Sequence, residues 1–124
     1  MIIGTGIDIV DIRRIESLLE RYGQRFITRV FTNKEIMSCE ARSGRASSYA
    51  KVFAVKEATI KAISNKEGIR WHDIEITHDE HGRPMITLTG TALKKTLEKD
   101  KNYKTHVTIS DERRYATAMV VIES

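Results

Sequence analysis

Two carboxylates and one lysine are the side chains of this sequence best suited to chemistry. Glu57 and Lys61 lie four residues apart in a stretch with helical spacing, so their side chains are neighbours on one helix face. Asp8 stands in an otherwise apolar, strand-like segment, where an acid is costly to bury unless it is paired or bound to a metal. Two hard carboxylates suit Mg²⁺, which takes one or two carboxylates together with phosphate oxygens of a substrate. Lys61 would then meet the same phosphate as a point charge.

Simpler structural roles explain the same residues. Glu57 and Lys61 could form a surface ion pair worth roughly a few tenths of a kcal/mol, and Asp8 could face water at a sheet edge. His106, which shares a strand face with Thr108 and Ser110, could be a structural hydrogen-bonding group. Spacing alone therefore leaves the choice between structural and catalytic roles open.

The chain has the size and composition of one globular domain. Its 124 residues are 40% hydrophobic and 31% charged, which is typical of a folded chain rather than a disordered one. We therefore expect a single domain over residues 1–124. A chain of this length buries only about two-thirds of its unfolded surface, too little to enclose a large cofactor. A site in a surface cleft or between subunits is the expected solution.

The charge balance predicts an anionic partner. Lys and Arg number 21 against 17 Asp and Glu, which gives a net charge of +4 and favours nucleic acid, phosphorylated ligands or an acidic protein. Arg14 and Arg21 share a face of the first helical stretch, and Arg25 extends that face if the helix continues past Gly23. The arginines are either solvated or a docking surface for an acidic partner.

Cysteine usage and hydropathy bear on the compartment. The lone Cys39 allows no internal disulfide, which fits a reducing environment. The apolar N-terminal run is too short to cross a bilayer and is interrupted by Asp8 and Asp11, and no later run is long enough. We therefore expect a cytoplasmic protein without membrane contact.

The first half of the chain has one strand followed by helical periodicity. Residues 2–10 alternate as a strand does, and Gly4 and Gly6 allow another backbone to approach closely. Asp11 is placed to cap a helix whose expected buried stripe is Ile12, Ile15, Leu19 and Tyr22. The other expected elements are a helix over about 32–42 opened by a Thr32–Glu35 capping box, a loop over 43–48 and the longest helix over 49–64.

The second half changes to strand-like alternation. Residues 72–78 and 85–89 predict a hairpin, residues 91–100 a short helix, and residues 104–109 and 115–122 two further strands. Helices gathered before antiparallel strands predict an α+β fold, with a mostly antiparallel sheet packed with one long and several shorter helices.

Several segments, in this order, resemble the bacterial holo-[acyl-carrier-protein] synthase family. The match is collinear and spans nearly the whole chain, and the run that begins at Phe53 resembles the family's signature helix. The segments are Gly4-x-Gly6-Ile7-Asp8-Ile9-Val10 with Arg14-Ile15, Phe53-Ala54-Val55-Lys56-Glu57-Ala58-x-x-Lys61-Ala62, Asp73-Ile74-Glu75-Ile76, Gly82-Arg83-Pro84, His106-Val107-Thr108-Ile109-Ser110 and Tyr115-Ala116-x-Ala118-x-Val120-Val121-Ile122-Glu123.

The resemblance implies a 4′-phosphopantetheinyl transferase. Members of this family move the phosphopantetheine arm of coenzyme A onto a serine of apo-acyl carrier protein, in a Mg²⁺-dependent reaction that releases adenosine 3′,5′-bisphosphate. They are α+β proteins, typically trimers, with the active site in a cleft between protomers. For this chain the resemblance therefore implies a homotrimer, coenzyme A as donor substrate and an acidic carrier protein as partner.

The matching positions also imply individual roles. Asp8 and Glu57 fall on the family's Mg²⁺ ligands, and Lys61 falls on its phosphate contact. Together with His106, these are the implied catalytic residues. Removal of the proton from the carrier serine stays open between a water on the metal, Glu57 and His106.

Other matching positions imply contacts with the two substrates. Lys61 and His106 fall on residues near the coenzyme A phosphates, and Arg83 and Pro84 lie in the segment that lines the adenine pocket. A basic residue of the family's first helix meets the carrier protein, and Arg14 falls on it. The expected carrier surface is therefore Arg14, Arg21 and Arg25.

The sequence departs from the family at places that border the expected coenzyme A phosphates. Val52 stands where many relatives have Arg, although Lys51 beside it could partly substitute. Residues 64–68 replace the usual Gly-Thr-Gly, and Asp111 stands where the late motif has a second His. We therefore expect an active enzyme with weakened or rearranged coenzyme A contacts.

Two other functions fit parts of the sequence. A non-catalytic carrier-binding relative is consistent with Val52 and Asp111. A small basic nucleic-acid-binding domain is consistent with the net charge, but an aromatic content of 6% and the lack of a stacking motif count against it.

Overall fold

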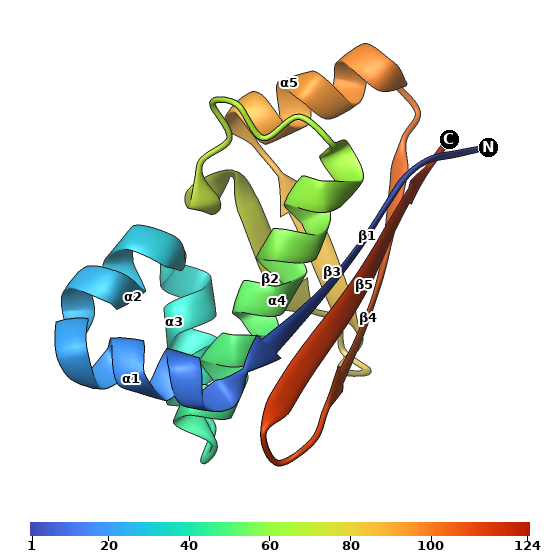
Figure 1. Ribbon diagram of the computed structural model, residues 1–124. Helices are drawn as coiled ribbons and strands as arrows, with labels where there is room; N and C mark the ends of the chain where they lie inside the picture. Colours follow the sequence, from blue (N-terminus) through green and yellow to red (C-terminus); the bar gives the residue numbers. More distant parts are fainter.

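Helix α4 (Arg45–Ile63) lies at the centre of the fold, and the other elements pack around it (Figure 1). The computed structural model describes all 124 residues. Most side chains of α4 are buried, including Phe53 and the polar Lys56. A helix covered around most of its circumference is the expected place for a long apolar run without a polar face.

A three-stranded antiparallel sheet covers one side of α4. Its strands, in spatial order, are β1 (Ile2–Asp11), β5 (Tyr115–Glu123) and β4 (Lys104–Asp111). Side chains alternate between the two faces of the sheet. The face toward α4 carries small and apolar residues, among them Gly6, Val10, Ala116, Ala118 and Val120.

Gly4 and Gly6 bring β1 into backbone contact with α4. A Cβ at Gly6 would collide with the carbonyl oxygen of Ala58, and one at Gly4 would collide with that of Ala62. Only glycine leaves room for such an approach. The close approach expected from the sequence is therefore confirmed, and it sets β1 directly over the helix.

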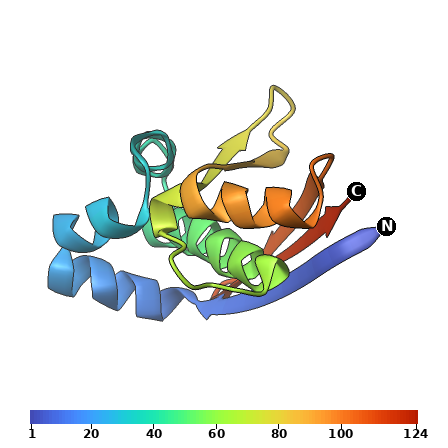
Figure 2. The same ribbon diagram turned by 90° about the horizontal axis from the view of Figure 1, so that it is seen from above.

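The remaining elements cover the other sides of α4, as the view from above shows (Figure 2). A one-turn 3₁₀ helix, η1, leads into a separate two-stranded sheet, which confirms the expected hairpin and antiparallel pairing. No helix has both the length and the apolar character needed to cross a membrane. The elements are α1 (Ile12–Tyr22), α2 (Gln24–Val30), α3 (Asn33–Glu40), η1 (Trp71–Asp73), β2 (Ile74–His78), β3 (Pro84–Leu88) and α5 (Gly90–Lys99).

The structure corrects three local predictions. The expected loop over 43–48 is reduced to residues 43 and 44, because α4 already begins at Arg45, whose guanidinium lies 2.9 Å from the carboxylate of Glu40 in α3. Gly23 has a φ of 53° and ends α1, so Arg25 belongs to the separate helix α2, which the sequence did not predict. Tyr22 is 45% exposed and does not belong to the buried stripe of α1.

A buried ion pair connects α4 with two of the elements that pack against it. Lys56 Nζ lies 2.8 Å from Glu35 Oε1, and both side chains are fully buried. Lys56 also donates to the carbonyls of Trp71 and Ile74, and Glu35 accepts from the backbone N–H of Ile76 at 2.7 Å. Burial lowers the pKa of Lys56, and the negative charge of Glu35 opposes this shift. The pair therefore holds α3, α4 and β2 together.

Candidate active site

Asp8, Glu57 and Lys61 come together where β1 crosses α4. Lys61 Nζ lies 3.2 Å from Asp8 Oδ1 and donates to the carbonyl of Ile7 at 2.9 Å. The ion-pair partner of Lys61 is thus Asp8 on the strand, rather than Glu57 on its own helix. The side chain of Asp8 is 16% exposed and that of Lys61 is 53% exposed, so the group sits at a partly covered, solvent-accessible position.

The glycine contact explains why these residues meet. Ala58, whose carbonyl faces Gly6, directly follows Glu57 in α4. Asp8 lies two residues beyond Gly6 on the same face of β1, so it points toward the same stretch of helix. The backbone contact therefore fixes the acid of the strand beside the acid and the lysine of the helix.

Glu57 is half-buried beside a second acid, with three cations nearby. Burial raises the pKa of Glu57 and the nearby Asp8 raises it further, while the positive charges of Lys61, Arg14 and Lys66 oppose the shift. No cluster of three or more His, Cys, Asp or Glu side chains suitable for a metal is present. A cation held by Asp8 and Glu57 would need its other ligands from water or substrate, which is the usual arrangement for Mg²⁺ with a phosphorylated substrate.

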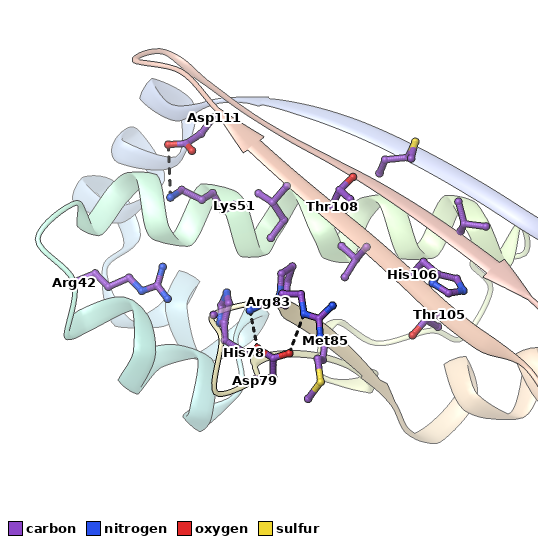
Figure 3. Close-up of a pocket in the computed structure, with 16 residues that line it drawn as sticks. Arg42, Lys51, His78, Asp79, Arg83, Met85, Thr105, His106, Thr108 and Asp111 are labelled. Carbon is purple, nitrogen blue, oxygen red and sulfur yellow. Dashed lines mark hydrogen bonds and ion pairs between the residues drawn. The ribbon is translucent and has the colours of Figure 1, made fainter.

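The predicted coenzyme A residues other than Lys61 lie elsewhere, in a cleft of about 740 Å³ (Figure 3). Arg83, Pro84 and His106 line this cleft, which runs from the β2–β3 hairpin to β4, whereas Asp8, Glu57 and Lys61 do not line it. Within one chain, the sequence-predicted residues therefore form two separate groups. We call the first the acid group (Asp8, Glu57 and Lys61) and the second the cleft group (Arg83, Pro84 and His106).

The cleft is rich in positive charge. Arg42 and His78, which the sequence analysis did not single out, line it together with Lys51 and Arg83. Lys51 Nζ lies 3.6 Å from Asp111 Oδ2, and Arg83 Nε lies 3.3 Å from Asp79 Oδ2. Burial lowers the pKa of His78, as do the charges of Arg42 and Lys51. No periodicity marks Arg42 or His78, because they come from the end of α3 and the end of β2 and meet only in the folded chain.

His106 lies on the outer face of the three-stranded sheet, the face turned away from α4. Its Nε2 is 3.4 Å from Glu123 Oε1 on the neighbouring strand β5. Ile7 and Ile9 of β1 are each 64% exposed on this face, and Met119 of β5 is 46% exposed. A contiguous exposed apolar surface of this kind is typical of an interaction site.

The expected carrier surface is exposed but not uniform. Arg14 lies over the ring of Phe53, 5.6 Å from its centroid, and close enough to Glu57 to oppose the rise in the pKa of that acid. Arg21 lies in the last turn of α1, and Arg25 lies in the first turn of α2, beyond the turn at Gly23. Arg14 therefore adjoins the acid group, and the other two arginines extend away from it.

Comparisons with known proteins find members of one enzyme family, aligned over nearly the whole chain. Residues 4–120 match the family described as the 4′-phosphopantetheinyl transferase superfamily. The holo-[acyl-carrier-protein] synthase of Paramagnetospirillum magneticum is 48% identical, over 100% of this chain and 98% of that protein. The crystal structure of the Neisseria meningitidis holo-[acyl-carrier-protein] synthase covers 100% of both chains with 37% identity and a TM-score of 0.86. That of the Helicobacter pylori enzyme, in complex with coenzyme A, covers 96% of this chain and 99% of its own with 33% identity and a TM-score of 0.80.

Proposed function

The chain belongs to the 4′-phosphopantetheinyl transferase superfamily, and from this we infer that it transfers the 4′-phosphopantetheine group of coenzyme A to a serine of apo-acyl carrier protein. The observation that carries this inference is the meeting of Asp8, Glu57 and Lys61, which come from distant parts of the sequence. Family membership also favours the transferase over a nucleic-acid-binding domain, and the α+β fold agrees with that of the solved relatives.

The acid group fits a Mg²⁺ ion. Asp8 and Glu57 supply two hard oxygen ligands, and Glu57 lies where burial and Asp8 disfavour its charged form, a cost that a cation would remove. Bound there, Mg²⁺ would stabilise the negative charge that develops on the 5′-phosphate of the leaving adenosine 3′,5′-bisphosphate when the diphosphate of coenzyme A is split. Lys61 would add a second positive charge at the same diphosphate.

The reaction asks the protein mainly for positioning and for charge stabilisation. The serine oxygen bonds to the phosphorus that carries the pantetheine, and the bond from that phosphorus to the bridging oxygen of the diphosphate breaks. Adenosine 3′,5′-bisphosphate leaves with the bonding electrons, and the serine proton passes to a base. Glu57 and His106 are this chain's candidate side chains for that base.

A carrier mass-shift assay tests the activity. Incubated with coenzyme A and Mg²⁺, the protein is expected to raise the mass of an apo-acyl carrier protein by one phosphopantetheine group. A chelator is expected to abolish the shift and excess Mg²⁺ to restore it, because the two carboxylates alone leave the diphosphate charge uncompensated. Mass spectrometry of the carrier gives the answer, and a carrier whose serine is replaced by Ala is the control. No shift with any carrier would overturn the proposal.

We also propose that the enzyme is a homotrimer whose sites lie between protomers. The acid group and the cleft group belong to separate regions of one chain, so a complete site needs both groups brought together. The exposed sheet face with Ile7, Ile9 and Met119 supports such an interface, since contacts between two different surfaces generate a ring when a threefold rotation relates the protomers.

Mixed trimers test this arrangement. A Glu57→Gln variant damages the acid group, and an Arg83→Ala, His106→Ala variant damages the cleft group, so each alone should be inactive. When equal amounts are unfolded and refolded together, about one quarter of the interfaces pair two intact halves in a three-membered ring. Activity should therefore return to about a quarter of the wild-type value.

The control for this experiment mixes Glu57→Gln with Asp8→Asn, two variants damaged in the same group. This mixture should stay inactive, because every interface lacks an intact acid group. If the first mixture is no more active than its two variants measured separately and added together, the proposal that two protomers share each site is contradicted.

The arginine surface supports an acidic carrier as the second substrate. Arg14, Arg21 and Arg25 are exposed, and complementary charge raises the rate of encounter in a salt-dependent manner. Arg14 beside Glu57 would bring the carrier serine toward the acid group. We place the reaction in the cytoplasm, where the free thiol of Cys39 would persist.

A further inference from the structure

The positive charges of the cleft differ in how firmly they are already paired. Arg83 faces Asp79, a carboxylate that also accepts from the backbone N–H groups of His81 and Arg83 and so belongs to the turn itself. Lys51 faces Asp111 at 3.6 Å, a distance at which no hydrogen bond forms. Arg42 faces no carboxylate at ion-pair distance. Lys51 is thus held by a loose partner that an anion could replace.

Arg42, Lys51 and His78 lie at one end of the cleft, as Figure 3 shows. The same three residues also border a small adjoining cavity of about 30 Å³. Burial lowers the pKa of His78, and the charges of Arg42 and Lys51 lower it further, while Asp79 opposes the shift. This end of the cleft therefore gathers positive charge in a place suited to a compact anion.

Coenzyme A carries two kinds of phosphate. Its diphosphate belongs with the acid group under the proposed function, which leaves the phosphomonoester on its ribose to be accommodated. A phosphomonoester needs several cationic donors in one place, and Arg42 with Lys51 provides them. Asp111 is the one carboxylate at this end that is not tied into a turn.

We propose that Asp111 is a specificity-determining residue that competes with this phosphomonoester for Lys51. Its carboxylate lowers the advantage of coenzyme A over 3′-dephospho-coenzyme A, the same donor without the phosphomonoester. The neighbouring Val52 is buried, carries no charge and does not line the main cleft. Lys51 is therefore the residue of this pair that can meet the phosphomonoester. The inference rests on the proposed function, since it concerns the donor of that reaction.

The test compares the two donors in the carrier mass-shift assay. Asp111→Asn should lower the KM for coenzyme A by about threefold, the size expected for freeing a half-exposed ion pair, with little change for 3′-dephospho-coenzyme A. Lys51→Met should raise the KM for coenzyme A and leave that for the dephospho donor nearly unchanged. In the Lys51→Met background, Asp111→Asn should lose its selective effect.

Glu112→Gln is the matched control, because it removes the same charge one residue away, from an exposed side chain that does not line the cleft. A direct titration with adenosine 3′,5′-bisphosphate and adenosine 5′-monophosphate repeats the comparison without catalysis. If Asp111→Asn changes both donors equally, or changes coenzyme A no more than Glu112→Gln does, the competition is refuted. Failure of the proposed function is distinct: the wild-type protein would then transfer nothing from either donor.

Discussion

Phosphopantetheinyl transfer is expected to slow by about a hundredfold or more when Asp8 is replaced by Asn or Glu57 by Gln. Each change removes one of the two charges that would hold the proposed cation, while the shape of the side chain is kept. The loss should appear in kcat, because the charge that a bound cation would neutralise grows on the phosphate of the leaving adenosine bisphosphate as the diphosphate is split. Initial rates of carrier modification over a range of Mg²⁺ concentrations measure the effect.

Glu98→Gln on α5 is the control for this pair, since it removes an exposed acid far from β1. It should leave the rate unchanged. The conservative Glu57→Asp should retain partial activity with a higher Mg²⁺ requirement, because the carboxylate is kept but withdrawn by one methylene. An Asp8→Asn or Glu57→Gln protein that works at the wild-type rate would remove that residue from the site.

Lys56→Met is expected to destabilise the fold by about 3–5 kcal/mol. The substitution leaves Glu35 buried with its charge uncompensated, and it also leaves the carbonyls of Trp71 and Ile74 without their donor. The double variant Glu35→Gln, Lys56→Met should recover part of the loss, because no buried charge remains. Urea denaturation followed by circular dichroism measures the free energy of unfolding.

Arg45→Met provides the contrast on the same helix. It breaks the ion pair with Glu40, whose two side chains are 45% and 41% exposed, and an exposed pair of this kind contributes about 1 kcal/mol or less. Equal losses of unfolding free energy for Lys56→Met and Arg45→Met would show that burial does not increase the contribution of the Glu35–Lys56 pair to stability.

Local patterns in the sequence predicted the elements that local physics determines. The Asp11 cap and the Thr32–Glu35 capping box are both present, since each satisfies free N–H groups within a few residues. The sequence did not predict α2, because seven residues after a helix-ending glycine carry too little periodicity to mark a helix. It placed the start of α4 late, because the serines of its first turn are typical of loops.

Long-range partners were harder to predict. The side chain of Glu35 was expected only to complete a capping box, but it also pairs with Lys56 and accepts from Ile76 across the fold. Lys61 was paired by spacing with Glu57, whereas the strand offers it both a carboxylate and a carbonyl. Such partners depend on tertiary packing, which periodicity along the chain does not encode.

The contact of Gly4 and Gly6 with α4 makes the spacing of Asp8 and Glu57 a property of the main chain. Core side chains such as Val10 could drift over evolution without shifting the two acids relative to each other. A single added methyl group on either glycine, by contrast, would wedge the strand off the helix and pull the acids apart. The relative placement of the two acids thus depends on two positions that carry no functional group at all.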